Sequence, residues 1–283
     1  MIDNLKQNPY ISDDVSIQIN YHPFRYYIIE NFFKPEVYDL ACSNTKDLNK
    51  TPRFCDISAS SYKARIKGLC KADLKDPFHF FASEDWHNFN SNLFDAKLNN
   101  YMSLNFHYHD KPGEKGFVHN DFNICGFKQD NFYGHSYYHK DQETPNLKDV
   151  VRYIRSIAFI YYFSGSPIDE KDGGTEILSD FSKVEKVIPA KNNSVFCFEI
   201  SPISFHNFFG STYDRITFMG WFHSSPAYWI KRNLDKVTQE YEKTGEVSVR
   251  WNTNKAWSIE KDPEFYNVFG EGSESIIKRF NLK

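Results

Sequence analysis

The sequence lacks a hydrophobic run long enough to cross a membrane. Its 283 residues contain no stretch of about 18 consecutive apolar side chains, the length that a spanning helix requires. Residues 1–10 are polar and lack the apolar segment of a signal peptide. We therefore expect no membrane partner and a cytoplasmic location.

Paired cysteines are also missing. The five cysteines include no Cys-x-x-Cys pair, and their number is odd. Reduced thiols in a cytosolic protein fit this pattern better than a disulfide framework does. No spacing typical of a cysteine zinc site is present either, so neither a disulfide scaffold nor a zinc module is expected.

Neither sign of charge dominates the chain. The 34 basic and 37 acidic residues leave a net charge of −3 and a pI of about 6.4, so we expect no nucleic-acid partner. Aromatic residues are plentiful instead, with 27 Phe and 18 Tyr. A chain of this length can bury a sizeable core, which must be largely aromatic. No pattern predicts an oligomeric state.

The first hundred residues predict a supporting layer with helices. Residues 22–33 are rich in aromatic and β-branched side chains and predict a strand. Pro35 suits the first turn of a helix that continues to about Asn49. Residues 84–100 place apolar side chains near helical spacing behind a pair of acids, and predict a second helix.

The middle of the chain predicts a β-structure. From about 101 to 224, short segments rich in Phe, Tyr, Ile and Val alternate with turn sequences. Strands without intervening helices indicate a sandwich, barrel or jelly roll. The polar stretch 123–149 predicts a functional loop or insert, and residues 225–283 a helical extension. We expect one domain, residues 1–283, mainly β with flanking helices.

Two motifs carry the chemistry. His119-Asn120-Asp121 is followed, 85 residues after Asp121, by His206 and then by Arg215. Two imidazoles and one carboxylate suit ferrous iron in oxygenases without haem. On a strand, residues 119 and 121 would share one face. His206 and Arg215 flank a turn sequence, so in a hairpin residue 206 would lie roughly opposite 215. Arg215 could then hold a carboxylate beside the metal.

Further candidates share the predicted strands. Alternation places Thr217 and Trp221 on the same face as Arg215. Thr217 is a candidate co-substrate contact, whereas Trp221 suits core packing better than substrate contact. Tyr161 and Tyr162 offer hydroxyl groups to a bound carboxylate.

These motifs resemble those of the 2-oxoglutarate- and Fe(II)-dependent dioxygenases, on the prolyl-4-hydroxylase-like side of that superfamily. The resemblance implies a double-stranded β-helix, which is a cupin-like jelly roll, over residues 101–224. It implies iron ligation by His119, Asp121 and His206. Arg215 matches the base that binds the distal carboxylate of 2-oxoglutarate.

The resemblance also implies two aromatic co-substrate contacts and a reaction. Tyr162 matches a hydroxyl on that carboxylate, and Tyr108 matches a hydroxyl near the co-substrate. The implied oxidoreductase uses Fe(II), O₂ and 2-oxoglutarate, with ascorbate as an optional reductant. It releases succinate and CO₂ and hydroxylates an unactivated C–H of a small metabolite or an amino-acid side chain. A prolyl hydroxylase acting on protein or peptide is the alternative.

A cupin-type module is a second alternative. His107, His109 and Glu114 have the spacing of a cupin metal motif, with His206 as a later ligand. Such a module would bind a metal or a sugar without 2-oxoglutarate. Glu114 lies in a turn sequence, and the glycines that normally frame the motif are misplaced. The dioxygenase interpretation expects alanine at His107 to leave activity largely intact.

Basic residues outside the motifs leave the substrate open. Arg152, Arg155 and Arg232 could bind an anionic group of a substrate or be solvated surface charges. His135 and His139 lie within the predicted insert and suit the surface better than a substrate contact.

Overall fold

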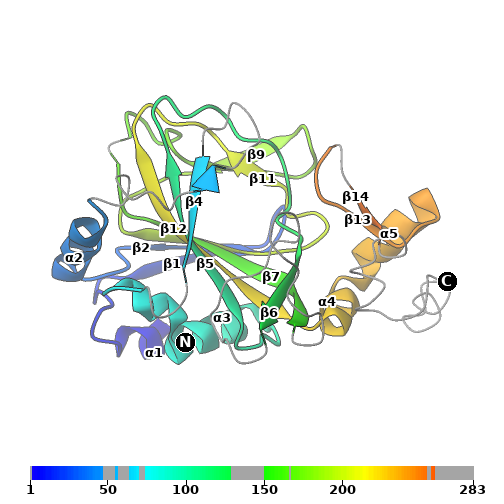
Figure 1. Cartoon of the computed structure of the whole chain (residues 1–283), viewed down its shortest axis with the longest axis horizontal. Helices are drawn as coiled ribbons and strands as arrows, with labels where there is room; N and C mark the ends of the chain where they lie inside the picture. Colours follow the sequence, from blue (N-terminus) through cyan, green and yellow to red (C-terminus); the bar gives the residue numbers. More distant parts are fainter. Residues whose placement is uncertain are drawn as a thin grey trace.

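The computed structural model describes residues 2–46, 55–56, 64–69, 74–128, 150–165, 167–253 and 256–258. The helices of this part are α1 (Ile2–Lys6), α2 (Pro35–Thr45), the 3₁₀ helix η4 (Phe78–Ala82), α3 (Glu84–Phe94), α4 (Pro226–Arg232) and α5 (Leu234–Thr244). The strands are β1 (Ser16–Asn20), β2 (Tyr26–Glu30), β3 (Cys55–Asp56), β4 (Ala64–Leu69), β5 (Met102–His109), β6 (Ile124–Lys128), β7 (Val150–Tyr162), β8 (Thr175–Leu178), β9 (Val184–Ile188), β10 (Ser194–Glu199), β11 (His206–Phe208), β12 (Arg215–Ser224), β13 (Ser248–Arg250) and β14 (Ala256–Ser258). Strands therefore dominate the described chain (Figure 1).

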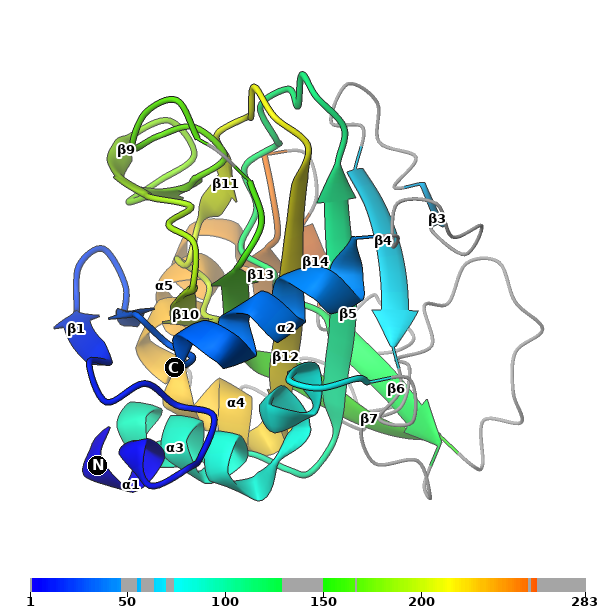
Figure 2. The ribbon, with the colours of Figure 1, turned by 90° about the vertical axis from the view of Figure 1, so that its left-hand side faces the viewer.

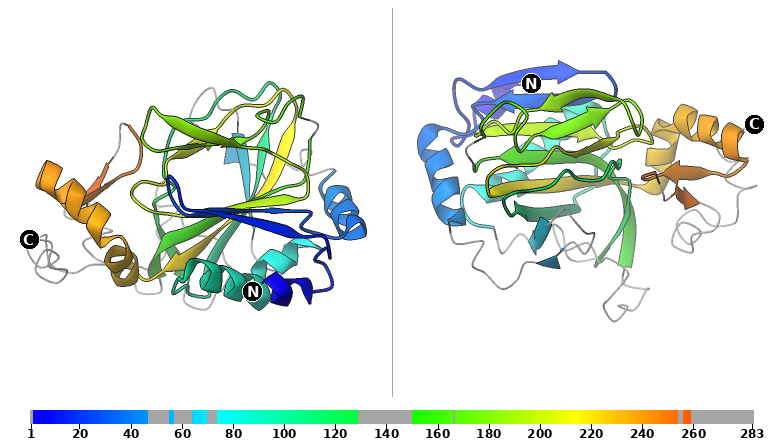
Figure 3. Two further views of the ribbon diagram at one scale, coloured as in Figure 1. Left: turned by 180° about the vertical axis from the view of Figure 1, so that it is seen from behind. Right: turned by 90° about the horizontal axis from the view of Figure 1, so that it is seen from above.

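Two antiparallel sheets form the body of the protein. The large sheet has the order β1-β2-β10-β7-β12-β5-β4-β3, and β6 pairs separately with β7. The small sheet has the order β11-β8-β9. It lies over one face of the large sheet, whereas α1 and α3 lie on the other side (Figures 1 and 3). This arrangement confirms the expected β-rich jelly roll.

Strand β7 shows how the sequence builds two cores. Phe159 and Tyr161 pack in the cluster shared with η4 and α3. Ile160 and Tyr162 pack in a second cluster between the two sheets. Successive side chains on a strand point to opposite faces. A continuous apolar run is therefore needed in a strand that is covered on both sides, and the sequence around residue 160 supplies it.

The C-terminal helices extend the inner core. Trp229 and Ile230 of α4 and Val237 of α5 are almost completely buried and join the cluster between the sheets. Val247 and Val249 join the same cluster.

No helix in the described ranges is long and apolar enough to cross a membrane.

Several element bounds differ from expectation. The second predicted helix ends at Phe94, because Asp95 adopts a left-handed conformation with φ of 48°. The expected loop 123–149 begins with strand β6, which pairs with β7. Its remainder, with His135 and His139, lies outside the described residues, as does the chain beyond 258.

Candidate functional site

Backbone pairing brings two histidines from distant parts of the chain together. The N–H of His119 donates to the carbonyl of His206 at 3.0 Å, and the N–H of His206 donates back at 2.8 Å. This exchange makes the two residues a hydrogen-bonded antiparallel pair. Their rings consequently face each other, with centroids 4.5 Å apart.

The carboxylate reaches the same place through a turn. Asp121 has φ of 62°, which is the left-handed region that Asp tolerates better than most residues. The side chain of Asn120 stabilises this turn, because its Oδ1 accepts from the N–H of Phe122 at 3.1 Å. The expectation that residues 119 and 121 share a face of a regular strand was therefore wrong, although both side chains do converge.

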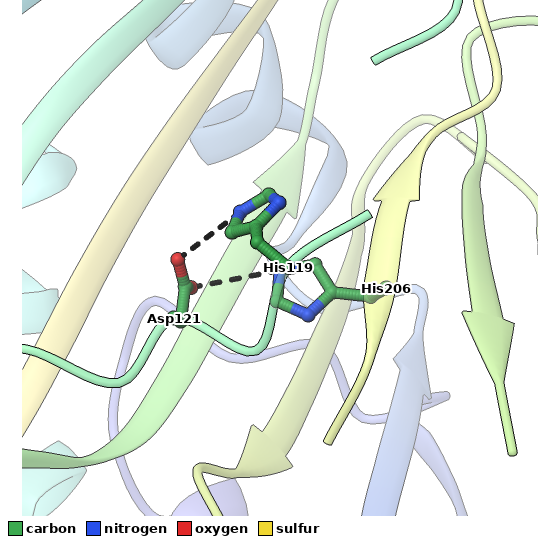
Figure 4. Close-up of side chains that lie close together, drawn as sticks. All are labelled: His119, Asp121 and His206. Carbon is green, nitrogen blue, oxygen red and sulfur yellow. Dashed lines mark ion pairs between the residues drawn. The ribbon is translucent and has the colours of Figure 1, made fainter. Parts of the chain in front are cut away.

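The three side chains point at one another (Figure 4). The Nε2 atom of His119 lies 3.3 Å from Oδ1 of Asp121, and that of His206 lies 3.6 Å from Oδ2. One ligand atom from each residue lies within 4.8 Å of the others. Within the described residues, this is the one cluster of three or more such groups. Metal bonds of about 2.1 Å place neighbouring ligand atoms roughly 3 Å apart, so the arrangement suits a single ion.

Backbone carbonyls orient both imidazoles for metal binding. Nδ1 of His119 lies 2.9 Å from the carbonyl of Phe117, and Nδ1 of His206 lies 2.9 Å from that of Ser204. A carbonyl can only accept, so each Nδ1 carries the proton. Each Nε2 then presents its lone pair to the centre, which is the state that binds a metal.

The protonation states favour a cation. Burial alone raises the pKa of Asp121. In acid, a hydrogen bond with His119 and the positive charges of protonated His206 and of Arg155 outweigh burial and lower the pKa well below its ordinary value. Burial lowers the pKa of His206 to about 4. At neutral pH the site therefore holds an ionised carboxylate and a neutral His206 imidazole, as metal ligation requires.

Two further side chains support the carboxylate. Nε1–H of Trp221 donates to Oδ2 of Asp121 at 2.9 Å. The guanidinium of Arg155 lies over the Trp221 ring at 4.0 Å and 3.9 Å from Oδ1 of Asp121. Arg155 is only 5% exposed, which excludes the solvated surface position considered from the sequence. The indole of Trp221 likewise does more than fill the core. No local pattern marks either contact in the sequence.

Replacing Trp221 with phenylalanine should weaken metal binding by about tenfold to a hundredfold, as is typical when a partner of a metal ligand is removed. Phenylalanine retains an aromatic ring in the core but loses the donor to Asp121. Calorimetric titration with Mn²⁺ measures the effect. Trp229→Phe is the matched control, since Nε1–H of Trp229 donates to the carbonyl of Ile200 at 3.1 Å. Equal affinities in the two variants would contradict the assignment.

The C-terminal extension holds the segment His119–Asp121 in place. The side chain of Asn120 donates to the carbonyl of Arg250 at 2.8 Å, and its backbone N–H donates to the carbonyl of Trp251 at 3.1 Å. His119 also forms a β-bridge with Asn252. Asn120 is thus a positioning residue that sequence analysis missed, because its partners lie 130 residues away.

Arg215 lies on the inner face, but not through the expected hairpin. It pairs with His109 of β5, whereas His206 pairs with Ile177 of β8 in the small sheet. Figure 2 shows β12 running beside β5, with β11 in the separate layer. The Arg215 guanidinium lies 4.8 Å from the ring of Phe208, two residues after His206. Arg215 on the large sheet therefore faces the strand of the small sheet that begins at His206.

The predicted neighbours of Arg215 divide into two groups. Its guanidinium lies 5.2 Å from the Tyr162 ring, whose hydroxyl is hydrogen-bonded to Thr175 at 2.7 Å. Thr217, on the same face, is fully buried. Tyr108 pairs with Ile216 on the opposite face, and its ring lies 4.3 Å from the guanidinium of Arg65. Tyr108 therefore lies on the face of β5 that points away from Arg215, and the structure does not support the expected co-substrate contact by Tyr108.

The cupin grouping does not form in the described chain. His107 and His109 point to the inner face of the large sheet, paired with Thr217 and Arg215. Glu114 is exposed beyond the end of β5 and joins no metal cluster. Among the described residues, the three-ligand site therefore excludes the cupin ligand set.

Buried histidine predicts acid sensitivity of the metal-free protein. Burial, and secondly the charge of Arg155, lower the pKa of His223 to about 3. The unfolded chain takes up this proton near pH 6.5. Between about pH 6.5 and 3, the unfolded state binds more protons, so the free energy of unfolding falls as pH falls, by about 1.4 kcal/mol per pH unit. Above this window, both states are neutral and the contribution vanishes.

Replacing His223 with glutamine should remove that part of the pH dependence. Urea unfolding of the metal-free protein at pH 7, 6 and 5 should show a slope that is shallower than the wild-type slope by about 1.4 kcal/mol per pH unit below pH 6. Identical slopes would show that His223 is protonated as readily in the folded state as in the unfolded chain.

Comparisons with known proteins give one kind of sequence relative and several solved structures of related shape. No protein-family model matches the sequence. The chain is 31% identical over 144 residues to prolyl 3-hydroxylase OGFOD1 of Mus musculus, covering 44% of this chain and 25% of the mouse protein. It thus spans about a quarter of that relative's length. A prolyl 4-hydroxylase structure from Phytophthora capsici is 13% identical with a TM-score of 0.49, and the match covers 71% of this chain and 59% of that protein. A prolyl 4-hydroxylase structure from Pseudomonas putida is 13% identical with a TM-score of 0.47, and the match covers 78% of this chain and 96% of that protein. The mouse relative confirms the sequence resemblance to prolyl hydroxylases.

Proposed function

We propose that the chain is an Fe(II)- and 2-oxoglutarate-dependent dioxygenase that hydroxylates an unactivated C–H bond. One observation carries the proposal. The ligand atoms of His119, Asp121 and His206 lie within 4.8 Å of one another, and Arg215 is 3% exposed on the inner face of the same jelly roll. The pairing of an open metal triad with a buried cation suits an anionic co-substrate that chelates the metal.

Each residue has a defined task in this proposal. The Nε2 lone pairs of His119 and His206 and the carboxylate of Asp121 would hold Fe(II), with three positions left for other ligands. Bound iron would supply the activation of O₂ that couples oxidation of 2-oxoglutarate to succinate and CO₂ with substrate hydroxylation. Arg215 would bind the distal carboxylate in a charge-assisted hydrogen bond. The surrounding apolar core excludes water from this pair, which strengthens it.

The substrate would approach from the side of His119. His119 is the most exposed of the three candidate ligands, and Phe117 beside it is 37% exposed. The rings of Phe117 and Trp251 lie 5.5 Å apart and flank His119 at 4.9 and 5.8 Å. We propose that this aromatic rim contacts a small metabolite or an amino-acid side chain. The mouse relative supports a prolyl side chain in a protein or peptide as the second candidate.

Succinate release tests the proposal. Iron-loaded protein is supplied with 2-oxoglutarate and O₂, first alone and then with proline-containing peptides or with free amino acids and other small metabolites. We expect substrate-dependent succinate formation and a mass gain of one oxygen in the substrate. Asp121→Ala is the control and should be inactive. Metal-loaded protein that binds no 2-oxoglutarate would contradict the proposal.

We also propose that residues 1–283 work as one domain. The extension after residue 225 supports this, because it provides the carbonyls that bind Asn120 and a ring beside His119. A stimulating effect of ascorbate and a cytoplasmic location stay predictions.

A further inference from the structure

A group of buried polar atoms lies on the inner face of the large sheet, where β5 pairs with β12. His107 is directly opposite Thr217, and His109 is directly opposite Arg215. Residues opposite each other in an antiparallel pair point to the same face. All four side chains are at least 93% buried. The sheet therefore presents a compact polar surface inside an otherwise apolar core.

Three atoms of this surface have no hydrogen-bond partner among the residues that the structure describes. They are Nε2 of His107, Oγ1 of Thr217 and Nε of Arg215. Leaving a buried donor unpaired is costly, and native proteins rarely tolerate it. Three such atoms at neighbouring positions indicate a ligand that offers several acceptor oxygens.

The position of His107 lies between the two parts of the proposed site. Along β12, Arg215 comes first, Thr217 opposite His107 comes next, and Trp221, which donates to Asp121, comes last. The His107 ring lies 6.2 Å from that of Trp221. A 2-oxo dicarboxylate that joins the metal to Arg215 must therefore pass beside His107.

The imidazole is neutral in this environment. Burial, and secondly the charge of Arg215, lower the pKa of His107 to about 3. A neutral imidazole has one donor and one acceptor. Facing a ligand whose oxygens only accept, Nε2 takes the proton and donates it as a hydrogen bond.

We propose that His107 is a co-substrate contact, whose Nε2–H donates to an oxygen of the 2-oxo acid held by Arg215. This inference rests on the proposed function. It replaces the contact expected from Tyr108, which lies on the other face of the same strand. It also revises the expectation that His107 can be replaced without consequence.

Binding of 2-oxoglutarate to Mn²⁺-loaded protein tests the assignment by calorimetry. His107→Leu preserves much of the volume but removes the donor, and should weaken 2-oxoglutarate binding by about tenfold to a hundredfold, as expected for a hydrogen bond to a charged group. His107→Gln restores an N–H donor and should bind within about threefold of wild type. Neither variant should change Mn²⁺ affinity, which separates this role from that of a metal ligand.

His223 provides the matched control. It is another buried imidazole with its pKa lowered to about 3, but it lies eight residues from Arg215 on β12, roughly 26 Å along the strand. His223→Gln should leave 2-oxoglutarate affinity unchanged. Wild-type affinity in His107→Leu would overturn the inference alone, whereas a wild-type protein that binds Mn²⁺ but no 2-oxoglutarate would overturn the proposed function.

A second measurement does not depend on the folding of His107→Leu. In Zn²⁺-loaded wild-type protein with ¹⁵N-labelled histidine, the Nε2 resonance of His107 should shift when 2-oxoglutarate is added. His107→Gln assigns that resonance by its disappearance. A resonance that stays in place while 2-oxoglutarate binds would overturn the inference, even if His107→Leu does not fold.

Discussion

Replacing Asp121 with alanine is expected to lower metal affinity on the order of a thousandfold, beyond the loss typical of a supporting residue, and to abolish turnover. The change removes one of three protein ligands and the sole negative charge among them. It also leaves Arg155, 3.9 Å from the carboxylate, without that partner. Titration with Mn²⁺ and succinate assays on iron-loaded protein measure the two effects.

Two matched variants make this result specific. Asp121→Asn keeps the side-chain size and should also fail to bind Mn²⁺ tightly, because the charge is lost. Asp110→Asn is the control, since Asp110 is 46% exposed and pairs with Arg65 away from the site. Tight metal binding by Asp121→Asn would remove the carboxylate from the ligand set.

Replacing Arg215 with glutamine is expected to weaken 2-oxoglutarate binding by about thirtyfold or more, while Mn²⁺ affinity stays near the wild-type value. Arg215 is 3% exposed, so its charge pair with a carboxylate would be well shielded from water. Removing one partner of a buried charge pair typically costs 2–5 kcal/mol, and about 1.4 kcal/mol corresponds to a factor of ten. Calorimetric titrations with each ligand separate the two affinities.

The geometry of the guanidinium can be tested in the same assay. Arg215→Lys keeps the charge but loses the fork of parallel donors, so it should recover only part of the affinity. Arg25→Gln is the control, because Arg25 donates to the carbonyls of Phe94 and Leu93 outside the site. Wild-type 2-oxoglutarate affinity in Arg215→Gln would place the co-substrate elsewhere.

The residue types of the candidate site could be predicted from the sequence, but the way the chain brings them together could not. His119, Asp121, His206 and Arg215 were identified because few other functions require those types together. The expected hairpin was wrong, since β11 and β12 belong to different sheets. Pairing between distant strands is decided by packing of the whole core, which local patterns do not record.

The two faces of β5 show a second limit of prediction from the sequence. A one-residue difference in register moves a side chain to the opposite face. Counting from the His119 motif selected Tyr108, whereas pairing with β12 turns Tyr108 outward and His107 inward. When the segment between β5 and His119 is irregular, spacing along the chain cannot decide which of two adjacent residues on β5 faces the site.

The burial of a charged side chain is a third feature that the sequence could not predict. Arg152, Arg155 and Arg232 look alike in the sequence, yet Arg155 alone lies beside Asp121. Arg232 pairs instead with Glu199 on the outside of the site. A register shift in β12 between Phe222 and His223 sets His223 opposite Arg155, and no local pattern in the sequence predicts this pairing.

Metal dependence of 2-oxoglutarate binding tests the central claim most directly, because that claim places both ligands in one site. Calorimetric titration of wild-type protein with 2-oxoglutarate, with and without Mn²⁺, should show binding of one equivalent only when the metal is present. Equal binding in its absence, or none in its presence, would contradict a shared site formed by the His119–Asp121–His206 triad and Arg215.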